Sequence, residues 1–154
     1  MKREEKKAYK KFFLMLGVSF LIMYFAMFLN VFSINHIYFS LTRVYMALLM
    51  VAPMSLSMMF FMRKMYKNKK LNRIIIITSI AVFVLALFFL RSQILISDEQ
   101  YMKAMIPHHS SAILTSNYAD IQDPEVQKLA KDIIDAQERE IELMENILEG
   151  LHKE

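Results

Sequence analysis

The chain has 154 residues, of which 56% are hydrophobic, and it contains two glycines, three prolines and no cysteine. This composition argues against a β-rich fold, because glycine and proline, the strongest turn formers, are scarce. The lack of cysteine leaves a soft metal ion only methionine and histidine as suitable ligands. The net charge of +4 hides an asymmetry: residues 1–97 carry 14 basic and two acidic residues (+12), whereas residues 98–154 carry five basic and 13 acidic residues (−8).

Three uncharged apolar runs lie within the first 96 residues. They cover 12–32, 44–62 and 74–90, with lengths of 21, 19 and 17 residues, and about 20 apolar residues suffice to cross a bilayer as a helix. The third run can extend through Arg91 if this side chain reaches the interface. The sequence therefore predicts a three-helix membrane anchor over residues 1–96, with helices near 12–32, 44–62 and 74–92.

Basic residues indicate which ends of these helices face the cytoplasm. They gather before the first run and between the second and third, at Lys2, Arg3, Lys6, Lys7, Lys10 and Lys11, then Arg63, Lys64, Lys67, Lys69, Lys70 and Arg73. Because short cytoplasmic loops are rich in Lys and Arg, we expect the N-terminus inside and the acidic segment outside the cytoplasmic membrane, in a periplasm or at a cell surface. Beside membrane helices, these clusters indicate topology and lipid contact rather than nucleic-acid binding.

A stripe of methionines lies within the second apolar run. Its members lie four residues apart, at Met46, Met50, Met54, Met58 and Met62, a spacing that puts them on one helix face. One interpretation is a sulfur ladder that passes a soft cation across the bilayer. We favour the other, flexible packing against neighbouring helices, because three helices make a poor pore without oligomerising.

Residues 97–154 have the composition of a water-soluble domain. Ser97-Asp-Glu-Gln100 has the form of a capping box and predicts a helix over 98–118. Asp123 followed by Pro124 predicts a second helix over 124–149, because Asp is a preferred cap and proline fits the first helical position. We expect the two helices to form an antiparallel hairpin. So small a hairpin buries little surface alone, and we expect it to dimerise into a four-helix bundle or to pack on the membrane helices.

Four candidate metal ligands lie within about two turns of the first hairpin helix, at Met102, Met105, His108 and His109. Spacings of three and four residues put side chains on one face. Imidazole nitrogen with thioether sulfur suits a soft ion, with Cu(I) favoured and Ag(I) or another transition metal as alternatives. Adjacent histidines point about 100° apart, so both reach one ion only if Pro107 kinks the helix. The alternative interpretation is a hydrogen-bonded pair of histidines with methionines packed in the core.

The second hairpin helix contributes the facing residues. If the helices fold back about residues 119–123, Met102 lies opposite about position 140. Met144 is then a further candidate ligand, while Gln137 and Glu140 are either direct ligands or hydrogen-bond partners that fix a histidine tautomer. A polar cluster inside an apolar seam is costly unless it is satisfied, and a bound cation would satisfy it.

Two patterns in this hairpin carry a family resemblance. They are Met105-Ile-Pro-His-His109-x-x-Ala112-Ile113 and Leu129-Ala-x-x-Ile133-Ile-x-x-Gln137-x-x-Glu140-Ile-x-x-Met144. Over about residues 98–151 the chain resembles a small ferritin-like family of unknown function recognised by its Met-Ile-Pro-His-His signature, and its anchor resembles that of a membrane-bound branch. Some soluble relatives bind copper in the periplasm, so the resemblance implies metal handling. Ser111 and Thr115 stand where metal-binding members tend to carry further methionines.

One function and one alternative follow. We expect a membrane-anchored protein, not an enzyme, that captures Cu(I) or Ag(I) outside the cytoplasmic membrane for copper handling or tolerance. The alternative is an interaction module without a metal, whose hairpin dimerises or docks on a membrane partner protein while its polar cluster fixes the register. The expected partners are thus a metal ion, the lipid bilayer and a second copy.

Overall fold

The fold is all-α, as predicted. The computed structural model describes residues 3–151, so Lys2 of the first basic cluster lies outside it. Over the described residues the chain forms five α-helices and one short 3-10 helix, and no strand. The chain divides into two compact units, one comprising residues 1–26 and 43–95 and the other residues 27–42 and 96–154.

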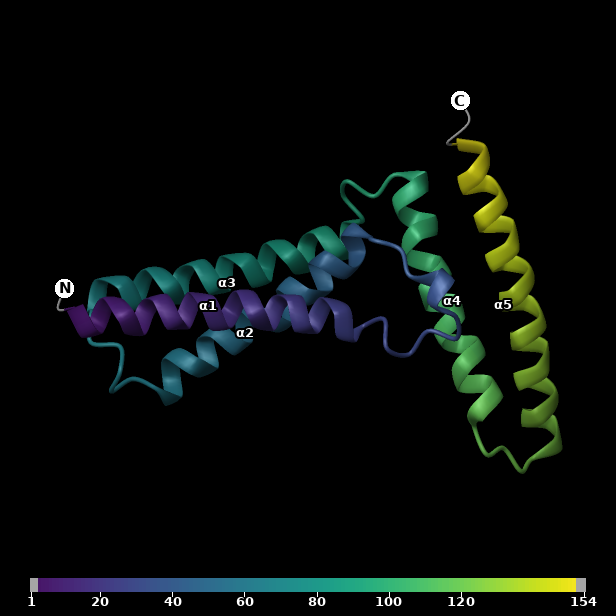
Figure 1. Cartoon of the computed structure of the whole chain (residues 1–154), viewed down its shortest axis with the longest axis horizontal. Coiled ribbons are helices and arrows are strands. Elements are labelled where there is room, and N and C mark those ends of the chain that lie inside the picture. The colour runs from purple at the N-terminus through teal and green to yellow at the C-terminus, as the bar shows by residue number, and fades with distance from the viewer. Residues whose placement is uncertain (1–2, 152–154) are drawn as a thin grey trace. The chain divides into compact units, whose positions relative to one another are not determined.

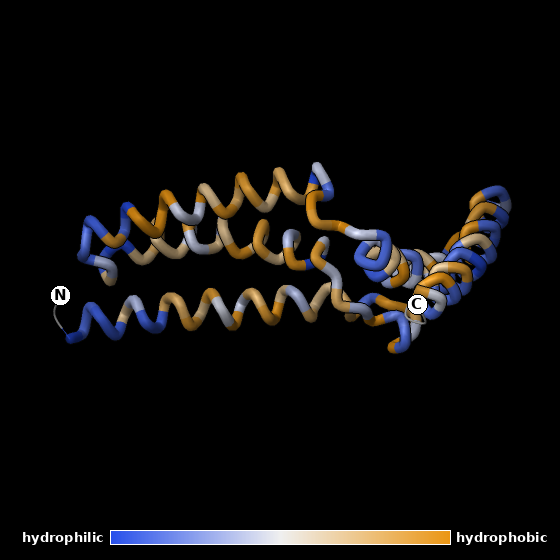
Figure 2. The backbone as a smooth tube through the Cα atoms, turned by 90° about the horizontal axis from the view of Figure 1, so that it is seen from above, coloured by the Kyte–Doolittle hydropathy of each residue, from blue (hydrophilic) through white to orange (hydrophobic). Residues whose placement is uncertain are grey.

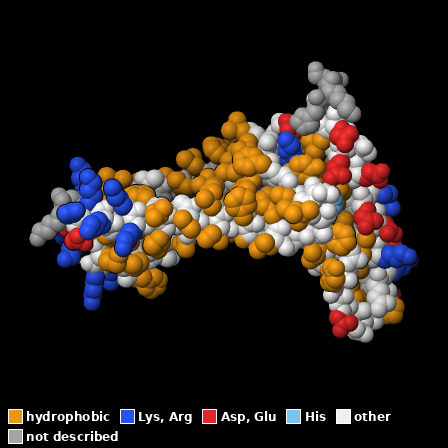
Figure 3. All heavy atoms as spheres, in the orientation of Figure 1, with side chains coloured by type: hydrophobic (Ala, Val, Ile, Leu, Met, Phe, Trp, Pro, Cys, Tyr) orange, Lys and Arg blue, Asp and Glu red, His pale blue; other side chains and the backbone are white. Residues whose placement is uncertain are grey.

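The first unit is built on three helices, α1 (Arg3–Ala26), α2 (Leu41–Phe61) and α3 (Lys69–Ser92) (Figure 1). Each is long and apolar enough to cross a membrane. Figure 2 shows hydrophobic residues along these helices and hydrophilic residues at the end that holds the N-terminus. In Figure 3 the Lys and Arg side chains gather at that same end. This pattern is typical of membrane helices with one basic end in water.

The first helix differs most from its predicted range of 12–32. It begins nine residues earlier, at Arg3, because lysine and glutamate are good helix formers whose long side chains can stay in water beside a bilayer. It ends six residues earlier, at Ala26, and the residues that follow belong to the second unit. α3 likewise begins early, because Asn68 caps it by accepting a 3.0 Å hydrogen bond from Leu71 N. An uncharged run therefore locates the middle of such a helix rather than its polar ends.

Side chains from all three helices pack together in the first unit. A buried cluster consists of Tyr9, Phe12, Met59, Tyr66 and Ile75. The hydroxyls of Ser55 and Ser79 share a 2.8 Å hydrogen bond between α2 and α3. An apolar hollow of about 280 Å³ remains between the helices.

The methionine stripe of α2 does not line this hollow. Met46 and Met50 are exposed on the helix surface, whereas Met58 and Met62 pack against the buried cluster. The stripe is thus divided between exposed surface and side-chain packing, an arrangement that favours packing over a cation path.

The second unit is built on the predicted hairpin. α4 (Asp98–Tyr118) and α5 (Pro124–Leu151) run antiparallel and side by side (Figure 1), and α5 extends two residues past its predicted end. The Ser97 hydroxyl caps α4 by accepting from Gln100 N. The Asp123 carboxylate caps α5 by accepting from Glu125 N at 2.8 Å and Val126 N at 3.1 Å.

A buried apolar cluster lies between α4 and α5. It consists of Met102, Ile106, Ile113, Ile141 and Leu148, with Tyr38, Ile134 and Met144 packed against it. Ile106 and Ile113 are 0% and 1% exposed. Because short helices are marginal in water on their own, burial of this cluster is the main source of hairpin stability.

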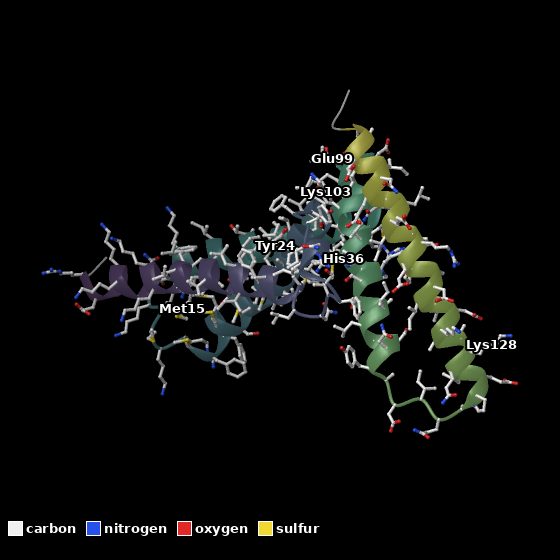
Figure 4. The ribbon with its side chains drawn as sticks, turned by 45° about the vertical axis from the view of Figure 1, so that its right-hand side comes forward. Met15, Tyr24, His36, Glu99, Lys103 and Lys128 are labelled. Carbon is white, nitrogen blue, oxygen red and sulfur yellow. The ribbon has the colours of Figure 1, made fainter. Side chains whose placement is uncertain are left out.

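The connection between α1 and α2 also belongs to the second unit. It contains η1 (Ile34–His36), and Figure 4 shows His36 beside α4. The hydroxyl of Ser110, which is fully buried, accepts a 2.8 Å hydrogen bond from Phe32 N and lies 2.8 Å from His36 Nδ1. The hairpin is therefore not self-contained, and residues 27–42 complete its unit.

Replacing Ser110 by alanine is expected to loosen this connection by roughly 1–2 kcal/mol, because a partly buried N–H loses its acceptor. Hydrogen exchange should become faster at residues 27–42 while α5 stays protected. Thr115→Ala is the matched control, because the exposed Thr115 hydroxyl donates within α4, to the Ser111 carbonyl oxygen at 2.9 Å. Unchanged exchange in the Ser110→Ala variant would show that the contact does not hold the connection in place.

Candidate metal centre

His109 is the most buried polar residue of the predicted ligand face. It lies on α4 with 8% of its surface exposed, and both ring nitrogens have partners. Nδ1 lies 3.0 Å from the carbonyl oxygen of Met105, and Nε2 lies 2.7 Å from Oε2 of Glu140 on α5. The Glu140 side chain is 55% exposed. The pair thus lies at the edge of the helix interface, with the imidazole inside and the carboxylate at the surface.

The two hydrogen bonds determine where protons must be. A backbone carbonyl oxygen can only accept, so Nδ1 carries a hydrogen. The 2.7 Å contact between Nε2 and Oε2 then needs one further proton, held either by the imidazole in an ion pair or by the carboxyl group. Without that proton, a nitrogen lone pair and a carboxylate oxygen face each other, and both are metal donors. A cation can therefore replace the proton at this contact.

The other predicted ligands take different places. His108 is exposed, with its ring centroid 6.0 Å from that of His109. Met105 is half-buried one turn before His109. Met102 and Met144 belong to the apolar cluster between the helices, and Met102 is 6% exposed. These two methionine side chains thus contribute to the packing between α4 and α5.

The hairpin register differs from the one expected from its loop. Position 140 was expected opposite Met102, yet Glu140 meets His109, seven residues or about two turns further along α4. Side chains lean toward the N-terminus of their own helix. In an antiparallel pair these directions are opposed, so two long side chains can meet without their Cα atoms lying directly opposite each other. Gln137 is half-buried one turn earlier on α5. The residue of α5 that contacts Nε2 of His109 is Glu140 rather than Gln137.

A second polar surface lies in the same unit. A hollow of about 280 Å³ is lined by Phe32, Ser33, His36, Ile113, Glu138, Ile141, Glu142 and Glu145. Within residues 3–151, however, no three His, Asp or Glu side chains come close enough together to hold a metal ion. One chain thus offers one imidazole and one carboxylate, at His109 and Glu140, and other donors must complete a coordination shell.

Tyr38, from the connection between α1 and α2, lies beside the acidic residues of α5. Burial, together with the negative charges of Glu145 and Glu149, raises the pKa of Tyr38 above its ordinary value. The phenol therefore stays protonated and donates to Oε1 of Glu145 at 3.5 Å. It adds no charge, so the negative potential of this face comes from the carboxylates alone.

Sequence comparisons agree with the resemblance seen in the hairpin. Residues 91–154, which include α4 and α5, match the family described as Domain of unknown function (DUF305). An uncharacterized protein of Acanthamoeba polyphaga mimivirus is 40% identical over 119 residues, which make up 76% of this chain and 76% of that protein. No solved structure matches the chain. The chain therefore belongs to the same family as the viral protein, with a C-terminal domain of the DUF305 type.

Proposed function

We propose that the chain is a membrane-anchored metal-binding protein that captures Cu(I) or Ag(I) through His109 and Met105, with Glu140 as the carboxylate that holds the imidazole in place or completes the site. The observation that carries this proposal is the 2.7 Å contact between Nε2 of His109 and Oε2 of Glu140, which brings an imidazole nitrogen and a carboxylate oxygen together at one place between the two helices. The bond from Nδ1 to the Met105 carbonyl supports it further, because metal-binding histidines commonly donate their second nitrogen to a carbonyl or carboxylate oxygen.

Met105 is the best candidate to extend the donor set. Its side chain lies one helical turn before His109 on the same face of α4, and its half-buried position lets the thioether turn toward an ion at Nε2. A thioether favours Cu(I) or Ag(I) over hard ions such as Mg²⁺. The exposed ring of His108 is available for a first contact with the ion, and Met102 and Met144 supply apolar packing behind the site.

We place the hairpin outside the cytoplasmic membrane and the N-terminus in the cytoplasm. The support is the gathering of basic side chains at one end of the three-helix unit (Figure 3), since cytoplasmic loops are rich in Lys and Arg. The acidic C-terminal segment then raises the local concentration of cations around the site. Metal capture for copper handling or tolerance is the role that this arrangement serves.

Cysteine labelling tests the orientation, because the chain has no cysteine of its own. Asn117→Cys on α4 is expected to react with a membrane-impermeant thiol reagent in intact cells. Lys67→Cys, in the connection between α2 and α3, is expected to react only after permeabilisation. Both positions are exposed in the structure, so the reverse pattern would place the hairpin inside.

Metal titration tests the function itself. The full-length protein in detergent should be used, because residues 27–42 pack on α4. With Cu(I), Ag(I), Cu(II) and Zn(II) offered separately, we expect about one Cu(I) or Ag(I) per chain. A variant with alanine at both 108 and 109 should lose this binding and keep its helicity. No binding by helical wild-type protein would refute the proposal and favour the interaction module.

A further inference from the structure

α5 carries two apolar faces, of which α4 covers one. On the covered face, Ile141 and Leu148 are each 4% exposed. The uncovered side chains are Val126 (46% exposed), Leu129 (57%), Leu143 (59%) and Ile147 (44%). A row of large apolar side chains along one helix in water is unfavourable and marks an interaction surface.

The uncovered residues follow a coiled-coil repeat. We define the outer seam as Val126, Leu129, Ile133, Ala136, Glu140, Leu143 and Ile147, which lie at alternate steps of three and four residues. A repeat of 3.5 residues pairs one helix with another, here over about 30 Å. Glu140 is the one charged residue in this seam, and its carboxylate is already bonded to His109.

The charges of α5 select the occupant of the outer seam. The helix carries eight acidic and three basic residues, so a membrane surface with anionic lipids would repel it. The charge is uneven along the helix: residues 124–137 carry two lysines and three acidic residues (−1), whereas residues 138–151 carry five glutamates and one arginine (−4). A parallel second copy would bring these glutamates side by side. An antiparallel copy instead sets each −4 half beside a −1 half that carries both lysines, which is much less repulsive.

We propose that the outer seam binds the outer seam of a second copy of this chain, with the two α5 helices antiparallel. One register covers the whole seam. In it, Leu129 lies opposite Ile147 of the second copy, Ile133 lies opposite its Leu143, and Ala136 lies opposite its Glu140. The smallest residue of the seam thus faces the charged one, which leaves room for the carboxylate and its bond to His109. The two hairpins together form a four-helix arrangement.

The same register brings the metal centres of the two copies close together, an inference that rests on the proposed function. The two-fold axis passes near residue 138, so each Glu140 lies within about one helical turn of it. The dimer covers the Glu140 side chain, which is 55% exposed in one chain, and brings two His109–Glu140 pairs close together. Two chains then supply the two imidazoles and two carboxylates that the described part of a single chain does not gather.

Disulfide crosslinking of the full-length protein reports this register directly, because the wild-type chain has no cysteine. Ile133→Cys combined with Leu143→Cys is expected to give a covalent dimer on mild oxidation without metal. Each single substitution is expected to give little crosslinking, because either residue lies about 15 Å along the axis from its equivalent in the second copy. The control is Lys131→Cys with Glu138→Cys, on the opposite face of α5, which should give none.

Native mass measurement supplies an independent test. Leu143→Glu is expected to convert a wild-type dimer to monomer without loss of helicity, whereas Lys131→Gln, which changes the charge equally, should leave the dimer intact. Crosslinking of the single variants, equal crosslinking of the control, or a monomeric wild-type protein would overturn the proposal. Because these measurements are made without metal, failure of the dimer and failure of metal binding are separate outcomes.

Discussion

Replacing His109 by alanine is expected to weaken Cu(I) binding by more than about 100-fold. Loss of an outer hydrogen-bond partner of a metal site costs about 10–100-fold, and His109 supplies the donor nitrogen itself. Among the histidines of residues 3–151, it is also the one whose ring nitrogen meets a carboxylate across the hairpin, at 2.7 Å from Glu140. A competition titration against a chelator of known Cu(I) affinity, followed on the full-length protein, measures this change.

The matched variants separate the roles of the neighbouring groups. His108→Ala removes an imidazole that is exposed and should change the affinity by only a few-fold. Glu140→Gln keeps the size of the side chain and removes its charge, and should weaken binding about 10–100-fold. Equal losses from His108→Ala and His109→Ala would contradict the assignment of His109 as the principal ligand.

Replacing Ile106 by alanine is expected to destabilise the hairpin by about 2–5 kcal/mol, because truncating a buried aliphatic side chain loses its burial and leaves a cavity. Ile106 is 0% exposed and belongs to the cluster that joins α4 to α5. Hydrogen exchange at the protected amides of α4 should become at least about 30-fold faster, since 1.4 kcal/mol corresponds to tenfold.

Tyr118→Ala is the control for this prediction, because Tyr118 lies on the same helix and is 79% exposed. It should change the stability by no more than about 0.5 kcal/mol. If Ile106→Ala had an effect as small as that of Tyr118→Ala, the cluster between α4 and α5 would not be what stabilises the hairpin.

Local signals in the sequence were sufficient for much of the fold. The cap at Ser97 and the Asp123-Pro124 pair predicted the starts of both hairpin helices, because capping depends on residues within one turn. The three uncharged runs predicted the three apolar helices, because a long continuous run of apolar residues is itself a local signal. Their ends were less predictable, and α1 begins at Arg3 because polar residues can continue a helix beyond an apolar run.

Tertiary contacts were harder to predict from the sequence. The hydrogen bonds of Ser110 to the connection before α2 join residues 78 and 74 positions apart, and no local pattern marks such a pair. The hairpin loop alone gave only an approximate register for Glu140, because the lean of long side chains was not included. Within the site, Glu140 lies 2.7 Å from Nε2 of His109, a geometry that suits the hydrogen-bonding role, one of the two roles expected of Glu140. Residue spacing alone could not show whether Met102 is a metal ligand or a core residue, because both kinds of side chain lie on the helix face that packs against α5.

The most direct test of the central claim is NMR spectroscopy of the full-length protein with 15N-labelled histidine, recorded with and without Ag(I). Binding at the pair predicts a large shift of the Nε2 resonance of His109, while Nδ1 keeps its hydrogen bond to the Met105 carbonyl oxygen. The His109→Ala variant should lose the binding. Tight binding that shifts the resonances of His108 or His36 and leaves those of His109 unchanged would contradict a metal centre at this pair.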